Sequence, residues 1–268
     1  MKKQKLYFIT YATKNFDTAA RHLMRLAKNS DFFENCIYFK PTDLPKDFKQ
    51  KYKNIFQYKR GAGYWIWKHK IILDTLKKID KGDIVIYSDS GSSFNHKAKK
   101  RFFEYIEMLN DSDFDNFRIE CEEQYLEKEW TIKQLFDYFS LSTDSKIGRS
   151  TQLEATQMIF QKSKDSMDYF SEYIDVLSSD MYLISDKFNN HNQIEEFKEN
   201  RHDQSIFSLL SKRRGCVSIK NETHFSSNPS IQHDYPFLSV RTYGHGFKDK
   251  LKFKINYQKK YDLPVFFD

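Results

Sequence analysis

The sequence predicts an α/β fold in which a central, mostly parallel sheet is flanked by helices. The chain opens with an apolar run at residues 6–9, apolar positions at helical spacing over 16–27, and a second apolar run at 35–39. This strand–helix–strand order is typical of parallel, nucleotide-binding layouts. Residues 84–87 are nearly all apolar, as expected of a central strand buried on both faces.

The remaining elements follow from periodicity and from turn residues. We expect helices over 47–58, 65–79, 95–109, 130–139, 163–177 and 203–210, and strands over 117–120, 154–160 and 216–219. Asp203 is expected to be an N-cap and Gly215 a C-cap. Polar loops are predicted at 141–152 and 186–199, and an irregular tail from 221.

One domain is the simplest organisation, because neither a linker nor an internal repeat is evident. We expect residues 1–110 to form the ligand-binding half, 111–220 the second half, and 221–268 a tail that packs on the domain.

Composition narrows the functional classes. The formal net charge of +7 over 268 residues favours phosphate-bearing ligands, nucleic acid or an anionic membrane face. The three cysteines are far apart and form no CxxC pair, which predicts reduced thiols and a cytosolic location. No apolar run reaches the length of a signal peptide core or of a membrane span.

Asp89 is the first candidate for chemistry, because it comes directly after the buried strand at 84–87 and before the turn Ser90-Gly91-Ser92. Ligands of α/β sheets bind beyond the carboxyl ends of the strands. A carboxylate there can hold Mg²⁺ or Mn²⁺ against a diphosphate. The structural alternative is an aspartate that caps its own turn.

The segment Arg60-Gly-Ala-Gly-Tyr-Trp-Ile-Trp-Lys68 is the second candidate. Its two glycines allow close approach of a ligand, the following helix offers N-terminal amides, and Arg60 and Lys68 supply positive charge. Tyr64, Trp65 and Trp67 could stack on a base or a sugar, although two tryptophans on one helical turn are more often core residues.

Further along the chain, Asp203 lies between His202 and Gln204 at the start of a predicted helix, and Glu154 lies beside a polar loop. Either acid could act as a base or bind a hydroxyl group, although an N-cap and an exposed strand end explain them as well. His245, between two glycines, is the best of the tail histidines for a metal or a phosphate. Neither a P-loop nor a GxSxG elbow is present.

The segment from Arg60 to Lys68, followed by Gly82-Asp-Ile-Val-Ile-Tyr-Ser-Asp89-Ser-Gly91, resembles a group of bacterial and viral GT-A type glycosyltransferases. That group carries an RGxGYWxWKP-like segment and a D-x-G or D-x-D element at a strand end. Glu154-Ala-Thr-Gln157 and His202-Asp-Gln-Ser205 resemble its downstream patterns. The motif here has one carboxylate where a full DxD has two, and His69 replaces the usual proline.

The resemblance implies a GT-A-like (Rossmann-like) domain that transfers a hexose, with galactose or glucose favoured, from a UDP-sugar to a glycan. The acceptor would be a lipid-linked precursor of O-antigen, capsule or lipo-oligosaccharide, reached by peripheral contact with the inner face of a membrane. The implied catalytic residues are Asp203 and Glu154, and Mn²⁺ or Mg²⁺ would bind Asp89. We expect His245, the candidate chosen above from the tail histidines, to be a second ligand of that ion. The implied nucleotide-sugar-binding residues are Arg60, Gly63, Tyr64, Lys68, Asp89, Ser90 and Gln204.

Two alternatives belong to other classes. A non-catalytic nucleic-acid or polyanion-binding protein would use the same charge and the interleaved lysines and aromatic residues, but the basic residues form no single stripe. We therefore expect no nucleic-acid partner. A phosphoryl-transfer enzyme is disfavoured by the missing P-loop.

Overall fold

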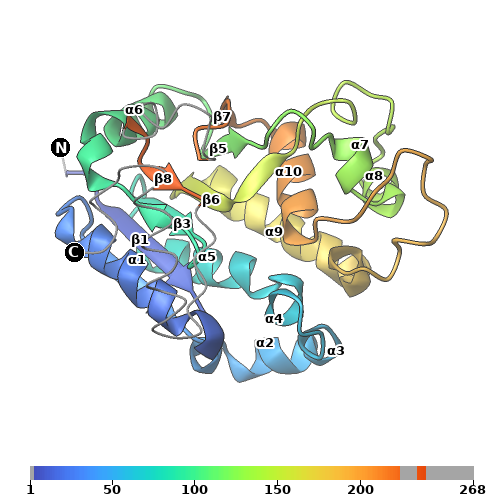
Figure 1. The fold of residues 1–268 in the computed structure, drawn as a ribbon, viewed down its shortest axis with the longest axis horizontal. Coiled ribbons are helices and arrows are strands. Elements are labelled where there is room, and N and C mark those ends of the chain that lie inside the picture. The colour runs from blue at the N-terminus through green and yellow to red at the C-terminus, as the bar shows by residue number, and fades with distance from the viewer. Residues whose placement is uncertain (1–2, 224–233, 240–268) are drawn as a thin grey trace, which may run out of the picture.

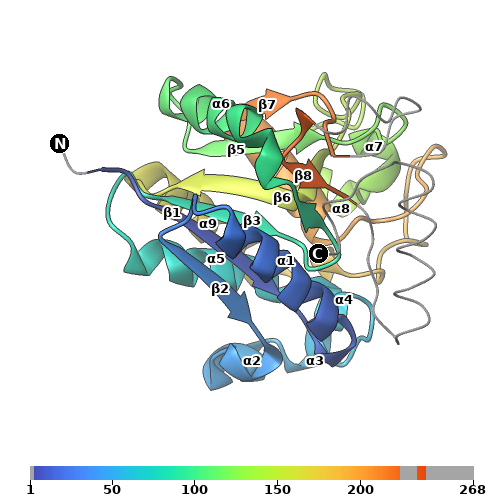
Figure 2. The ribbon, with the colours of Figure 1, turned by 60° about the vertical axis from the view of Figure 1, so that its left-hand side comes forward.

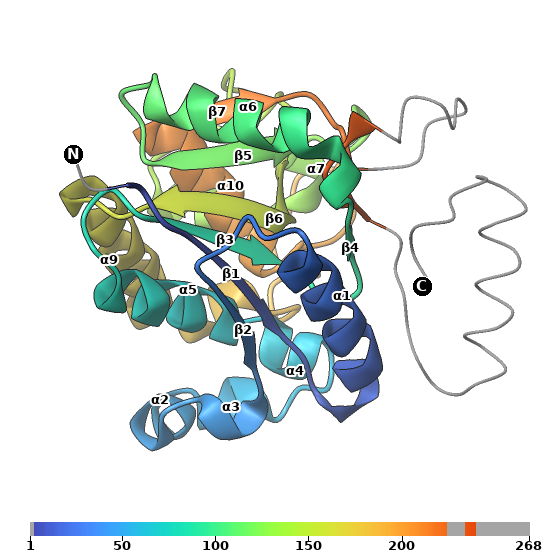
Figure 3. The same cartoon turned by 90° about the vertical axis from the view of Figure 1, so that its left-hand side faces the viewer.

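A computed structural model of the chain describes residues 3–223 and 234–239. Its centre is a six-stranded sheet in the order β2-β1-β3-β6-β5-β7, which Figure 3 shows from bottom to top. The strands are β1 Leu6–Tyr11, β2 Asn35–Phe39, β3 Ile84–Ser88, β5 Asn116–Glu120, β6 Leu153–Gln161 and β7 Val217–Ile219. A separate two-stranded pair joins β4 Ser93–Phe94 to β8 Phe237–Leu238.

Ten α-helical segments connect or cover the strands in the described part of the chain (Figure 1). They are α1 Asp17–Asn29, α2 Lys46–Lys51, α3 Lys53–Phe56, α4 Gly61–Tyr64, α5 Trp67–Lys78, α6 Lys99–Asn110, α7 Glu127–Trp130, α8 Lys133–Tyr138, α9 Lys164–Ser179 and α10 Asp203–Arg214. None of them combines the length and the apolar character that a membrane crossing needs.

The predicted α/β architecture is confirmed. The strands β2, β1 and β3 pair in parallel, β6 runs antiparallel to β3 and β5, and β7 is parallel to β5. Helices α1 and α6 cover one face of the sheet, while α5, α9 and α10 cover the other (Figure 2). Each face has its own apolar core, and alternate residues of β3 contribute to both, which explains why its residues 84–87 are almost all apolar.

Several boundaries differ from the sequence prediction, and the helix expected over 130–139 is one of them, because the extended residues Thr131 and Ile132 separate α7 from α8. The helix expected over 47–58 is split at Tyr52, whose backbone leaves helical geometry and whose ring is buried. The helix expected from Asn95 begins as a single 3-10 turn, His96–Ala98, before α6. Asp203 is the first residue of α10 rather than its N-cap, a position that His202 occupies.

Candidate functional site

The carboxyl ends of β1, β2 and β3 meet at one edge of the sheet, because these strands are parallel neighbours. Tyr11 ends β1 and Asp89 follows β3. The ends of these two strands are joined by the Thr10 hydroxyl, which donates to the Ser88 carbonyl at 2.7 Å. A cavity of about 350 Å³ opens beside Tyr11. Its other lining residues are Pro41, Leu44, Lys49, Lys53, Phe56, Gln57 and Ala62.

At the same edge, a lysine lies buried between two aspartates. The Lys68 ammonium is 2.7 Å from an Asp203 carboxylate oxygen and 3.3 Å from Asp89 Oδ1. It also donates to the Ala155 carbonyl at 2.9 Å, and the Tyr87 hydroxyl donates to Asp89 Oδ1. The sequence predicted each charged residue as a site candidate, and the fold brings all three into contact.

Burial perturbs the acid–base properties of this cluster. Loss of hydration raises the pKa of Asp203 to about 6, although the neighbouring Lys68 ammonium lowers it. Burial alone would lower the pKa of Lys68, but the two carboxylates outweigh it and the pKa is raised. Lys68 therefore stays charged, while Asp203 can exchange a proton near neutral pH.

The segment that precedes Lys68 forms a left-handed turn rather than an ordinary helix start. Gly61, Ala62, Gly63, Tyr64 and Trp65 have consecutive φ angles of 57°, 50°, 92°, 52° and 58°. A left-handed conformation costs a non-glycine residue about 1–2 kcal/mol. The Trp67 indole N–H donates to the Gly61 carbonyl at 3.0 Å, and the Trp67 ring stacks on Tyr11 with centroids 3.8 Å apart.

A second polar cluster adjoins the first; the sequence predicted Arg60, Tyr64 and His202 as candidates but not their acidic partners Asp186 and Glu199. Asp186 accepts hydrogen bonds from the Tyr64 hydroxyl at 3.0 Å and from His202 Nε2 at 2.8 Å, and the rings of Tyr64 and His202 stack. Arg60 pairs with both Asp186 and Glu199. Asp186 and Glu199 lie at the two ends of the polar loop predicted at 186–199, and nothing in that loop's pattern singles them out.

The pKa values of this second cluster follow from its burial and its hydrogen bonds. Burial chiefly lowers the pKa of His202 to about 4, so its ring is neutral and can donate through Nε2. Partial burial would raise the pKa of Asp186, but hydrogen bonds from His202 and Tyr64 outweigh it and lower the pKa. Asp186 is therefore ionised at neutral pH and pairs with Arg60.

The other predicted site residues that the structure describes form no ion pair with Lys68, although Ser90 and Gln204 directly follow its partners Asp89 and Asp203. Glu154 is buried in β6, and its Oε1 accepts hydrogen bonds from Asn221 at 2.9 Å and Thr223 at 2.8 Å. Gln204 donates to the Gln152 side chain at 2.8 Å. Ser90 is buried directly after Asp89. His245 lies outside the described residues.

Two places could accept a cation. Asp89 supplies one carboxylate that is 30% exposed, with Oδ1 engaged by Lys68, so a divalent ion there would share its remaining ligands with phosphate oxygens. Elsewhere in the described chain, Asp186, Glu199 and His202 offer ligand atoms within 4.8 Å of one another. The Arg60 guanidinium already lies against both carboxylates of that group, so an ion would have to displace it.

The fold is similar to that of a glycosyltransferase involved in the glycosylation of the major capsid of PBCV-1, with a TM-score of 0.51 and 10% identity over 94% of this chain and 98% of that one. Similarity extends to LgtC, solved as an active-site mutant, at a TM-score of 0.47 and 11% identity, covering 97% of this chain and 98% of that one.

Mouse xyloside xylosyltransferase 1 has the same TM-score of 0.47 and 11% identity, covering 83% of this chain and 88% of that one. No protein-family model matches the chain, and no curated protein matches its sequence. The chain therefore has a GT-A-like α/β fold, a conclusion that depends on the first of these likenesses because the other two TM-scores are below 0.5.

Proposed function

We propose that the chain is a glycosyltransferase that moves a hexose, with galactose or glucose favoured, from a UDP-sugar to a glycan of a surface polysaccharide. The observation that carries the proposal is the Lys68 ammonium buried between Asp89 and Asp203 at the carboxyl ends of the sheet. A buried ion pair is costly to form and is weak evidence for stability alone. Perturbed titratable groups at such an edge are favoured candidates for a functional site.

In this proposal, the cavity beside Tyr11 receives the nucleoside of the donor. Its lining includes aromatic and apolar side chains, as a base requires, and also Lys49 and Lys53, which can contact phosphate or ribose. We assign four further residues to the donor side because they lie close in sequence to Lys68 or Asp89. They are Arg60, Gly63, Tyr64 and Ser90.

Asp89 is assigned to the diphosphate, with Mn²⁺ or Mg²⁺ as the ion and His245 as a second ligand. Such an ion, when bound, neutralises charge that develops on the leaving nucleoside diphosphate. Lys68 holds the Asp89 carboxylate in place and adds a fixed positive charge 3.3 Å from it.

Transfer breaks the bond between the anomeric carbon and the phosphate oxygen, and the acceptor oxygen takes its place while its hydroxyl proton leaves. We assign Asp203 to the transferring sugar, because its carboxylate is oriented by Lys68 and its pKa, raised to about 6, allows proton exchange near neutral pH. Glu154 is assigned to the acceptor side as the second carboxylate. An inverting reaction would use one of them as a base, and a retaining one would use them to hold the sugar.

The acceptor in this proposal is an O-antigen, capsule or lipo-oligosaccharide precursor, lipid-linked and met at the inner face of a membrane. Support comes from the net charge of +7 and from the exposed lysines Lys46, Lys51 and Lys53 of α2 and α3, of which Lys53 lines the cavity. A lysine near an anionic bilayer contributes about 1 kcal/mol to binding.

A nucleotide-sugar hydrolysis screen tests the donor and the activity together. UDP-galactose, UDP-glucose, a GDP-sugar and a CMP-sugar are compared, each with and without Mn²⁺, and the free nucleotides are tested by thermal shift. We expect turnover of one UDP-sugar and stabilisation by UDP. No shift with any nucleotide, together with salt-sensitive binding to oligonucleotides, would instead favour the polyanion-binding protein.

Variants connect the activity to the site. Asp89→Asn and Asp203→Asn should each abolish turnover while the protein stays folded, whereas Asp74→Asn should not. Asp74 is a suitable control because it lies on α5, the helix of Lys68, and pairs only with Lys70 among the ion pairs described. Full activity of Asp89→Asn would remove that residue from the site.

A further inference from the structure

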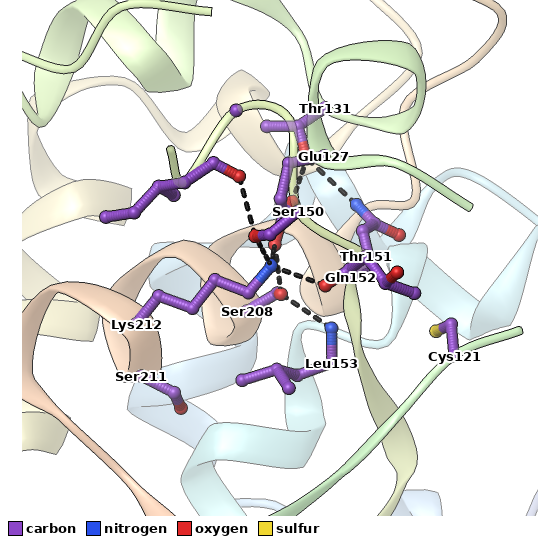
Figure 4. Close-up of polar contacts among 12 residues, drawn as sticks. Cys121, Glu127, Thr131, Ser150, Thr151, Gln152, Leu153, Ser208, Ser211 and Lys212 are labelled. Carbon is purple, nitrogen blue, oxygen red and sulfur yellow. Dashed lines mark hydrogen bonds and ion pairs between the residues drawn. The ribbon is translucent and has the colours of Figure 1, made fainter. Parts of the chain in front are cut away.

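A buried polar chain connects the segment after β5 to α10, on the side of the sheet that carries Lys68 (Figure 4). It begins at Glu127, which is fully buried and pairs with the Lys212 ammonium at 2.9 Å. Glu127 Oε1 also accepts from the Ser208 hydroxyl, and Oε2 accepts from the Thr131 hydroxyl at 2.9 Å. Every neighbour of this carboxylate donates, so both of its oxygens are acceptors.

The hydrogen bond from Thr131 to Glu127 determines which group donates between Thr131 and Gln152. Because the Thr131 proton is used on Glu127, its oxygen can only accept, and Gln152 Nε2 donates to it at 2.9 Å. The same nitrogen donates to the Trp130 carbonyl at 3.1 Å. If the Gln152 amide were turned over, its oxygen would face two acceptors. The amide orientation of Gln152 is therefore determined by its surroundings and not only by shape.

The orientation of the Gln152 amide in turn determines that of the Gln204 amide. Gln152 presents its oxygen, and Gln204 Nε2 donates to it at 2.8 Å. Gln204 Oε1 then accepts from the Ala155 backbone N–H at 3.4 Å. Turning Gln204 over would set two donors against each other at this end, so both ends of the chain require the same orientation.

Ala155 belongs to an irregular part of β6, where the register with β5 jumps from Met158 opposite Arg118 to Leu153 opposite Glu120. This irregularity turns backbone groups away from the sheet ladder. The Ala155 N–H meets Gln204, its carbonyl accepts from Lys68 at 2.9 Å, and the Thr156 carbonyl accepts from the Asp89 N–H at 2.8 Å. The polar chain thus ends at the residue that also holds the Lys68 ammonium.

We propose that Glu127, Thr131 and Gln152 are positioning residues that, together with the Ala155 N–H, hold the Gln204 side-chain amide in one orientation, with its oxygen toward Ala155. None of them touches the Lys68 cluster directly, and they act through Gln204 and through the irregular segment of β6. The inference rests on the proposed function to the extent that Gln204 serves the transfer reaction.

Thr131→Val is the informative variant, because it keeps the branched shape of the side chain and removes the hydroxyl. That hydroxyl donates to Glu127 and accepts from the Gln152 amide. We expect kcat to fall about tenfold with KM little changed, since misorientation affects the reacting geometry more than ground-state binding. Thr131→Ser restores the hydroxyl and should restore most of kcat. If Ser and Val at this position are equally impaired, the hydroxyl is not the cause and the proposal is overturned.

A double-mutant cycle tests whether the effect passes through Gln204. In a Gln204→Met background, Thr131→Val should lower kcat no further, because the amide that it positions is already gone. The same tenfold loss in both backgrounds would show that Thr131 acts by another route and would overturn the proposal.

An NMR measurement separates this inference from the proposed function. The side-chain amide signal of Gln204, assigned by its loss in Gln204→Met, should shift in Thr131→Val and return toward its wild-type position in Thr131→Ser. If the wild type turns over no nucleotide-sugar but the signal responds as expected, the hydrogen-bonded chain is real and the proposed activity is wrong. A signal that is unchanged in Thr131→Val overturns the inference whatever the activity.

Discussion

Replacing Lys68 by methionine tests the buried cluster most directly. Methionine keeps the apolar stem and removes the ammonium that contacts Asp203 at 2.7 Å, Asp89 at 3.3 Å and the Ala155 carbonyl at 2.9 Å. Removing one partner of a buried ion pair leaves an uncompensated charge and costs about 3–5 kcal/mol. The expected loss in the free energy of unfolding at pH 8 is therefore in that range.

The loss should also depend on pH, in a direction that the pKa of Asp203 determines. Lys68 lowers that pKa, so without the ammonium it should rise above the wild-type value of about 6, while the pKa in the unfolded chain stays the same. A group whose folded pKa is raised loses stability as the pH rises toward that value, and each further unit costs about 1.4 kcal/mol. The variant should therefore be less impaired at pH 5 than at pH 8.

Urea unfolding at several pH values between 5 and 8 measures both quantities. Lys70→Met is the matched control, because Lys70 lies on the same helix and forms a partly exposed pair with Asp74, whose removal should cost about 0.5 kcal/mol or less. A loss under about 1 kcal/mol for Lys68→Met, or a loss that is constant from pH 5 to 8, would refute the buried-pair argument.

Three other outcomes are expected. Gly61→Ala should unfold at a lower temperature than Gly82→Ala. Both glycines have positive φ, but a Cβ at Gly61 would lie 2.4 Å from the Trp65 ring, whereas a Cβ at Gly82 would have none of the described atoms within 4 Å. Equal melting temperatures would contradict the left-handed turn. If ionised Asp203 serves the proposed transfer, kcat should fall below about pH 6, and a profile without this acid limb would exclude that role. EDTA should abolish turnover and Mn²⁺ restore it, whereas full activity in EDTA would remove the cation from Asp89.

Local patterns were sufficient to predict the sheet strands that bury both faces. The run at 84–87 could be predicted because alternate residues of β3 pack into two separate cores. The break in the helix expected at 47–58 could not, since it depends on tertiary contacts. The Tyr52 ring packs against Phe48 and against His69 of α5, and the chain leaves helical geometry at that residue.

The candidate residues could be predicted individually, but their partnerships could not. Lys68 was expected to contribute charge at a ligand pocket, yet it is 2% exposed and neutralised by Asp203, which lies 135 positions later in the chain. Only the antiparallel placement of β6 beside β3, with α10 packed on β6, brings these residues together. Asp186 could not be predicted for the same reason, because it becomes a site candidate only through its hydrogen bonds with Tyr64 and His202.

Backbone strain is concentrated just before both members of the buried pair. Tyr64 and Trp65 have positive φ and are separated from Lys68 only by Ile66 and Trp67, while His202 has a φ of 61° and immediately precedes Asp203. Such conformations cost about 1–3 kcal/mol each and persist where surrounding contacts enforce them. Here the two strained segments enforce each other, because the Tyr64 and His202 rings stack 4.8 Å apart and both side chains bind Asp186. Contacts next to the Lys68–Asp203 pair thus offset the backbone strain that precedes both residues. Removing the hydrogen bonds of Asp186 should therefore weaken the pair, although Asp186 is not part of it.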